Sequence, residues 1–235
     1  ESTDEGRSWS EPFYVRPQPN DEGWVGWPNN SVHGIQLALG KRKGRLVIPA
    51  FLYKEGEPGQ VPGVRGGLLY SDDHGKNWLA GAVLPEGSDE VSLVETVEGG
   101  IYVSYRKNTL ATGKRHFARS SDFGEAFCEH GQHEEIPDAG LHAGLTRYRR
   151  DSQSESILLF SNPCIAREMT IRMSRDEGRS WLISRRLEPG LSRYSDLAVT
   201  ADGTILCLYT NGKVRDSEKI SVARFNLEWL TAGNS

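Results

Sequence analysis

The chain has 235 residues, of which 26% are charged, and its formal net charge is −4. This length is enough for one sizeable domain, and we expect a single domain over residues 1–235. The acidic balance argues against a nucleic-acid partner, and no apolar run is long enough to span a membrane. The cysteines, Cys128, Cys164 and Cys207, match neither a disulfide framework nor a zinc pattern. We therefore expect no metal and no cofactor.

An eight-residue pattern, Ser-x-Asp-x-Gly-x-x-aromatic, occurs four times along the chain. The copies are Ser2–Trp9, Ser71–Trp78, Ser120–Phe127 and Ser174–Trp181. Short Ser and Asp acceptors next to a glycine that allows positive φ predict a β-turn, and the aromatic can pack into a small core of the same unit. The aspartates are 69, 49 and 54 residues apart. Repeats of this length are typical of four-stranded propeller blades with insertions.

Between these octets, short apolar or alternating runs bounded by turn residues predict strands. In chain order the runs are Leu46–Leu52, Gly67–Tyr70, Ile101–Tyr105, Ile157–Ser161, Met169–Ser174, Leu197–Thr200, Ile205–Tyr209 and Ile220–Phe225. Two stretches rich in Gly and Pro, Gln18–Ser31 and Glu55–Gly66, are interpreted as long surface loops. Only Asn226–Thr231 favours a short helix, and the predicted fold is all-β.

The octets resemble the Asp-boxes of the exo-α-sialidases (neuraminidases). Because Asp-boxes also occur in other propeller proteins, they alone imply a fold and not a function. The segments between them extend the resemblance. Glu90–Asn108 resembles the sialidase segment that carries an active-site glutamate and the second arginine of an arginine triad. In this sequence those positions are Glu90 and Arg106.

Two further segments continue the resemblance over nearly the whole chain. Leu159–Arg167 resembles the family's Leu-Phe-Ser-Asn-Pro segment, which puts Arg167 on the third arginine. Arg193–Val199 resembles the Tyr-Ser-Asp-Leu segment, whose tyrosine is the family's nucleophile, and here this residue is Tyr194. The resemblance implies a six-bladed β-propeller of four-stranded antiparallel blades.

The resemblance also implies a reaction, namely retaining hydrolysis of terminal α-linked sialic acids from oligosaccharides, glycoproteins or glycolipids. Sialidases use a tyrosine nucleophile in place of the usual carboxylate. A neutral phenol needs a base, and this role falls to Glu90. Planar guanidinium groups bind a carboxylate bidentately, which suits Arg106 and Arg167 to the substrate carboxylate.

The resemblance also bears on four further residues. His33 suits a loop-packing role as well as a substrate contact. His142 stands where many relatives have glutamine, and it is a second possible contact. Arg172, in an alternating strand, is expected to be structural. Thr210 occupies a position where relatives carry a glutamate.

The family's first arginine and its general-acid aspartate precede the first Asp-box. The resemblance therefore predicts that roughly the first blade is absent and that the segment alone is inactive. Asp21 and Asp89 do not match the segment that carries the acid. The alternative function is a non-catalytic Asp-box propeller that binds sialylated or other glycans. The sequence predicts no compartment.

Overall fold

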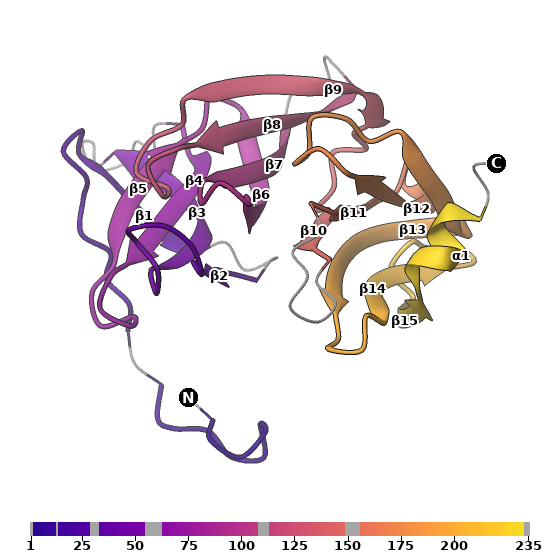
Figure 1. The fold of residues 1–235 in the computed structure, drawn as a ribbon, viewed down its shortest axis with the longest axis horizontal. Helices are drawn as coiled ribbons and strands as arrows, with labels where there is room; N and C mark the ends of the chain where they lie inside the picture. The colour runs from indigo at the N-terminus through magenta and orange to yellow at the C-terminus, as the bar shows by residue number, and fades with distance from the viewer. Residues whose placement is uncertain are drawn as a thin grey trace.

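The computed structural model describes residues 2–12, 14–28, 33–54, 63–107, 113–148 and 156–232. Three antiparallel sheets follow one another around an arc (Figure 1). β1–β5 lie at the left of the view, β6–β9 at the top and β10–β15 at the right. The N-terminal segment extends away from this arc. The all-β prediction is confirmed, with one short helix at the C-terminal end.

The first sheet contains five strands that fill four positions. They are β1 (Trp24–Pro28), β2 (Ile35–Gln36), β3 (Leu46–Lys54), β4 (Arg65–Ser71) and β5 (Leu79–Val83). β1 and β2 both pair with β3, at opposite ends of it, so together they form one interrupted edge strand. The loop prediction for Gln18–Ser31 is therefore wrong over β1. Its Pro- and Gly-rich surroundings concealed a short aromatic strand that gains stability from pairing with β3.

Most of the second predicted loop, Glu55–Gly66, lies outside the described residues. Its last two residues belong to β4, which starts at Arg65.

The second sheet is a four-stranded meander in the order β6-β7-β8-β9. Its strands are β6 (Ser88–Glu95), β7 (Ile101–Lys107), β8 (Lys114–Ser120) and β9 (Glu129–Pro137). Only β7 was among the predicted strands. β8 and β9 are rich in charged residues and histidine, so the strand pattern did not show in their sequences. Cross-strand pairing stabilises them in spite of this composition.

The third sheet joins two blades through one long strand. It contains β10 (Gly144–Arg147), β11 (Leu158–Asn162), β12 (Arg167–Ser174), β13 (Ile183–Val199), β14 (Ile205–Gly212) and β15 (Lys219–Phe225). The first part of β13 pairs with β12, and the part from Leu191 onward also pairs with β14. α1 (Leu227–Thr231) follows, and the Asn226 side chain caps it by accepting from the Trp229 N–H. The predicted C-terminal helix is confirmed.

Apolar cores lie between successive blades. One contains Val47 and Leu68 of the first sheet with Leu93 and Val103 of the second. The next contains Tyr102 of the second sheet with Phe160 and Trp181 of the third. A further core lies within the third sheet and contains Met169, Ile171, Leu197, Ile205, Cys207 and Leu230. Burial between neighbouring sheets is how stacked blades gain their hydrophobic stabilisation.

The four octets form nearly identical turns. In Ser174–Trp181 the Ser174 hydroxyl donates to Asp176 Oδ1 (2.7 Å) and accepts from the Gly178 N–H (2.8 Å). Asp176 Oδ1 accepts from the backbone N–H of Ser180, four positions on (2.9 Å). Glu177 and Gly178 both have positive φ, as turns of this type require. The predicted turns are confirmed, and in the described sheets they connect β4 to β5, β8 to β9 and β12 to β13.

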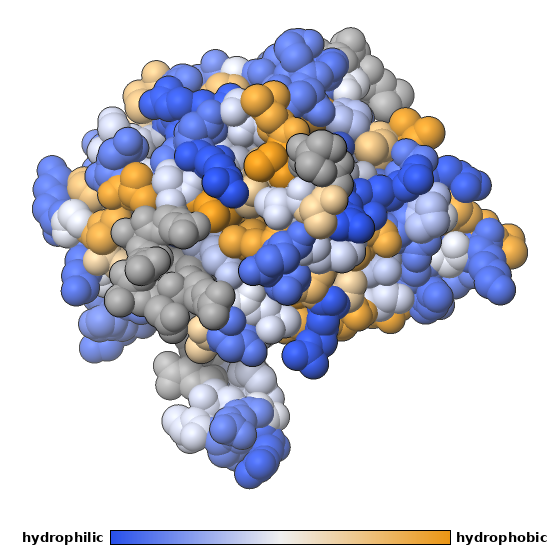
Figure 2. Space-filling model, turned by 45° about the vertical axis from the view of Figure 1, so that its right-hand side comes forward, coloured by the Kyte–Doolittle hydropathy of each residue, from blue (hydrophilic) through white to orange (hydrophobic). Residues whose placement is uncertain are grey.

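The surface carries scattered apolar side chains. Figure 2 turns the β10–β15 side toward the viewer and shows apolar patches between hydrophilic ones. Exposed residues of the third sheet include Leu208, Ile220 and Val222. Within the described residues, no helix has the length and hydropathy needed to cross a membrane.

Candidate active site

The predicted site residues lie at the rim of the blades opposite to the Asp-boxes. Arg106 is next to the end of β7 and Glu90 is near the start of β6, which pair antiparallel and meet at one edge. Arg167 starts β12, whereas the Asp-box at Ser174 ends the same strand. The sequence thus places scaffold turns at one rim and candidate chemistry at the other.

β-Bulges shape this rim. Ser88 pairs with Lys107 and Val91 pairs with Tyr105, so Asp89 and Glu90 together lie opposite the single residue Arg106. A bulge bends its strand and re-aims its side chains, and bulges are frequent beside active sites. Here the bulge brings two consecutive carboxylates toward one guanidinium, although consecutive residues in a regular strand point to opposite faces.

The Arg106 guanidinium makes ion pairs with both carboxylates. Its Nε donates to Glu90 Oε2 (2.5 Å), and its Nη2 lies 2.9 Å from Asp89 Oδ2. The Glu90 side chain is 6% exposed, and those of Asp89 and Arg106 are 15% and 18% exposed. Charge-assisted hydrogen bonds of this length are strong and directional. They fix the orientation of the guanidinium, and the sequence did not predict the part played by Asp89.

Tyr194 lies in a second bulge. Ser192 pairs with Asn211 and Ser195 with Tyr209, so Arg193 and Tyr194 lie opposite Thr210. Burial raises the pKa of the Tyr194 phenol, and a hydrogen bond with Glu90 and the negative charge of Glu90 raise it further. The structure therefore brings Glu90, Arg106 and Tyr194 together from two sheets.

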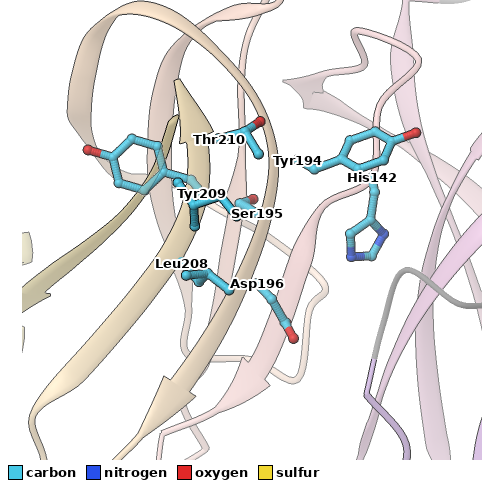
Figure 3. Close-up of a pocket in the computed structure, with 8 residues that line it drawn as sticks. His142, Tyr194, Ser195, Asp196, Leu208, Tyr209 and Thr210 are labelled. Carbon is cyan, nitrogen blue, oxygen red and sulfur yellow. The ribbon is translucent and has the colours of Figure 1, made fainter. Parts of the chain in front are cut away.

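A cavity of about 140 Å³ opens beside Tyr194. Its lining residues are His142, Tyr194, Ser195, Asp196, Leu208, Tyr209, Thr210 and Ile220. Figure 3 shows the His142 and Tyr194 rings next to each other, with Tyr209 and Thr210 on the strand beyond. The Thr210 hydroxyl is buried and has no hydrogen-bond partner within the described residues.

His142 packs edge-on against Tyr194, with 6.0 Å between ring centroids and an interplanar angle of 87°. The residue is 1% exposed. Burial lowers its pKa to about 3, and the positive charge of Arg115 acts in the same direction. The imidazole is therefore uncharged at neutral pH. Neither ring nitrogen has a hydrogen-bond partner in the part of the chain that is described.

His33 contacts the strand that carries Tyr194. Its Nδ1 lies 2.9 Å from Asp196 Oδ2, and the two side chains are 40% and 34% exposed. The hydrogen bond with Asp196 raises the pKa of His33, whereas partial burial acts against this rise. This contact joins the region before β2 to β13, and no sequence pattern predicted Asp196 as the partner of His33.

Arg167 is the predicted site residue that the structure does not connect to the others. Its side chain is exposed and makes no hydrogen bond or ion pair among the described residues. The backbone around it is unusual, because both neighbours, Ala166 and Glu168, have positive φ (55° and 58°). Non-glycine residues in this region cost free energy and are often found at functional positions.

Arg172 is structural, as expected. It is 5% exposed, and its guanidinium donates to Asn162 Oδ1 (2.5 Å) on the neighbouring strand. In the described part of the chain, no group of three or more His, Cys, Asp or Glu side chains is arranged to hold a metal ion.

Comparisons with known proteins agree with this architecture. The model of the BNR repeat-like domain family matches residues 1–207. A sialidase of Micromonospora viridifaciens is 34% identical over 97% of this chain, and a sialidase of Bacteroides fragilis is 28% identical over 88%. The chain spans 35% and 38% of the lengths of these two proteins.

Among solved structures, a Hadza microbial sialidase superimposes with a TM-score of 0.77 at 26% identity. The match covers 97% of this chain and 43% of the other. The predicted sialidase-type β-propeller is confirmed by this superposition and by the antiparallel sheets. The similar proteins reported above are named sialidases, and the chain itself belongs to the BNR repeat-like domain family.

Proposed function

We propose that the protein containing this chain is a retaining exo-α-sialidase that removes terminal α-linked sialic acids from oligosaccharides, glycoproteins or glycolipids. The names of its relatives support the reaction class. The observation that carries the proposal is the cluster in which Glu90 interacts with both the Tyr194 phenol and the Arg106 guanidinium.

In the proposed first step, Tyr194 Oη attacks the anomeric carbon as its proton passes to Glu90. The bond to the leaving oxygen breaks, that oxygen takes up a proton from the general acid that the family resemblance places before the first Asp-box, and a covalent glycosyl–tyrosine forms. Because the raised pKa of Tyr194 keeps the phenol protonated at neutral pH, a base in contact with it is needed. Water then displaces the tyrosine, and two successive displacements retain the anomeric configuration.

A tyrosine nucleophile suits a substrate that carries a carboxylate on its anomeric carbon. An anionic nucleophile would be repelled by that carboxylate, whereas a protonated phenol is not. In the proposal, Arg106 and Arg167 hold the carboxylate. The ion pairs to Asp89 and Glu90 pre-orient the Arg106 guanidinium, and such preorganisation lowers the cost of binding. The exposed side chain of Arg167 would need to turn toward the substrate.

The test uses the full-length protein and its Tyr194→Phe variant with a fluorogenic sialoside. The variant keeps the ring and removes the nucleophilic oxygen, so we expect kcat to fall on the order of 10³-fold. Incubation with a fluorinated sialosyl fluoride should add one sugar mass to the peptide containing Tyr194. Unchanged turnover by Tyr194→Phe would contradict the proposed mechanism. Glycan binding without any turnover by the unmodified protein would indicate a binding propeller instead.

A further inference from the structure

The segment that carries His142 lies between the two halves of the candidate site. It follows β9, the last strand of the second sheet, and precedes β10, the first strand of the third sheet. The second sheet contributes Glu90 and Arg106 to the site, and the third sheet contributes Tyr194. The His142 ring therefore stands where the two halves meet. A displacement of this segment would therefore change the distance between Tyr194 and the second sheet.

Side chains of the second sheet hold the backbone on both sides of His142. The carbonyl of Leu141 accepts a hydrogen bond from Arg115 Nη1 (2.9 Å), and the carbonyl of Ala143 accepts one from the Ser92 hydroxyl. Ser92 lies two positions after Glu90 on β6. Arg115 also donates from Nε to Ser104 (3.0 Å), on the strand that carries Arg106.

Arg115 is suited to this task because it is fully buried. Its guanidinium lies 5.6 Å from the centre of the Phe160 ring, and its Nη1 is 3.6 Å from Asp138 Oδ1. Asp138 in turn accepts from the Gly140 N–H (2.9 Å), which closes the turn before Leu141. A buried planar donor group loses little freedom when it forms hydrogen bonds, so it makes a rigid attachment.

The His142 side chain is held differently from its backbone. Its nitrogens have no hydrogen-bond partner in the described chain, and the ring is buried against Tyr194 in an edge-to-face arrangement. Such aromatic pairs prefer this geometry and add stabilisation beyond burial alone. Within the described chain, the His142 ring is therefore held by packing against Tyr194 and not by hydrogen bonds.

We infer that His142 is a positioning residue, an aromatic spacer that transmits the position of the Glu90 strand to the ring of Tyr194. The inference rests on the proposed roles of Glu90 and Tyr194. It differs from a role as a substrate contact, in which the imidazole nitrogens would bind the sugar. The ring is what matters for a spacer, whereas the nitrogens are what matter for a substrate contact.

Three variants of the full-length protein separate these roles. His142→Phe keeps a ring without nitrogens, His142→Gln keeps donor and acceptor groups without a ring, and His142→Ala keeps neither. We expect kcat to stay within about 3-fold for His142→Phe and to fall about 10- to 100-fold for the other two, with KM little changed, because small misplacements of reacting groups are this costly. A rise in KM for His142→Phe with full activity in His142→Gln would overturn the inference.

Two variants test the attachment itself. Ser92→Ala and Arg115→Lys each loosen one flanking carbonyl, and we expect each to lower kcat by less than His142→Ala. Combined with His142→Ala, they should add almost nothing, since coupled positions are not additive. Fully additive effects would contradict the inference. His133→Ala is the matched control, because His133 is also buried and edge-on to an aromatic ring, Trp181, away from the site. It should lower stability and leave kcat of the folded protein unchanged.

A measurement independent of turnover completes the test. The ring of Tyr194 should cause an NMR ring-current shift of the His142 ring protons. This shift should disappear in the Tyr194→Leu variant. It should persist in the Glu90→Gln variant, which keeps both rings. Loss of activity in Tyr194→Phe with no ring-current shift at His142 would sink the inference while leaving the proposed function intact. A ring-current shift at His142 together with unchanged turnover in Tyr194→Phe would instead contradict the proposed function.

Discussion

The two rims of the blades are built in different ways. At the Asp-box rim, each turn is closed by hydrogen bonds within one octet, such as those of Ser174 with Asp176 and Gly178. At the opposite rim, Glu90 and Arg106 from the second sheet meet Tyr194 from the third, and two bulges re-aim their side chains. Repetition in the sequence marks the first rim, and the candidate chemistry at the second rim depends on residues that occur once.

This difference means that the two rims should fail differently. A change at the Asp-box rim removes local hydrogen bonds and core contacts, so it should reduce the free energy of unfolding. A change at the site rim leaves most packing in place and should reduce turnover. Pairs of equivalent residues, one from each rim, can test this separation.

Glu90 and Glu95 form a matched pair, because both are buried glutamates near opposite ends of β6. The largest effect on turnover is expected for this pair. Glu90→Gln keeps the size of the side chain and removes the base, so kcat/KM for a sialoside should fall 10²- to 10⁴-fold, on the scale typical of general-base loss. Glu95 accepts from the N–H groups of Ala38 and Leu39. Glu95→Gln should therefore lower stability in chemical denaturation with kcat maintained. Equal losses of kcat in both variants would show that the rims are not separate.

Arg106 and Arg119 form a second pair, in neighbouring strands of the same sheet. Lysine cannot reproduce a planar fork, so Arg106→Lys should weaken both its ion pairs and substrate binding. Loss of one charge-assisted hydrogen bond, about 1.5–3 kcal/mol, corresponds to a rise in KM of roughly 10- to 100-fold. Arg119 donates to the carbonyl of Glu177 in an Asp-box (2.7 Å), and Arg119→Lys should leave KM unchanged. Steady-state kinetics of both variants would reveal any exception.

The Asp-box rim could be predicted from the sequence more fully than the site rim, because its contacts lie within one octet and those of the site rim join different sheets. The octet turns are local, and their residue types state the turn chemistry directly, so all four were predicted. Arg106 and Tyr194 were found through resemblance to a family, not through a local rule. The bulges were missed, because they depend on the register between strands, and register is fixed by pairing partners distant in sequence.

Two other residues show where sequence reasoning stops. Asp89 stands beside Glu90 in the sequence, and these adjacent carboxylates were the only sequence signal for the two ion-pair partners of Arg106. Asp196 gave none, because its contact with His33 joins regions on different sheets. The burial of the Asp-box aromatics was equally hidden. Trp181 is 2% exposed and Trp9 is 73% exposed, although their octets are almost the same.

This contrast between two octets gives a third prediction, at the Asp-box rim alone. Asp176→Ala removes the acceptor for several turn hydrogen bonds above a buried tryptophan, and it should cost about 1–3 kcal/mol of unfolding free energy. Asp4→Ala changes the same position in the octet with the exposed Trp9, and its cost in unfolding free energy should be smaller. Urea denaturation of the two variants gives the comparison. Similar losses would mean that the turn, and not the packing of its aromatic, determines the contribution.

His33 provides the smallest expected effect, and its sign can be derived. Because the hydrogen bond with Asp196 raises the pKa of His33 in the folded state, protonation favours folding. The stabilisation by protonated His33 is fully present below the ordinary histidine pKa near 6.5. It is lost as the pH rises through the pKa of His33 in the folded state. Both side chains are more than a third exposed, so solvent screening should keep it below about 1 kcal/mol.

The His33→Asn variant tests this pH dependence. Its unfolding free energy should fall below that of the unmodified protein at pH 5.5, and the two should converge by pH 9. Added salt should reduce the difference at pH 5.5, because the ion pair is exposed. His130→Asn, at a histidine of the second sheet, is the control. Burial lowers the pKa of His130, so protonation disfavours folding there, and this variant should not fall below the unmodified protein at pH 5.5. A difference that stays constant from pH 5.5 to 9 would mean that His33 stabilises the site rim through packing, and that the charge of Asp196 takes no part.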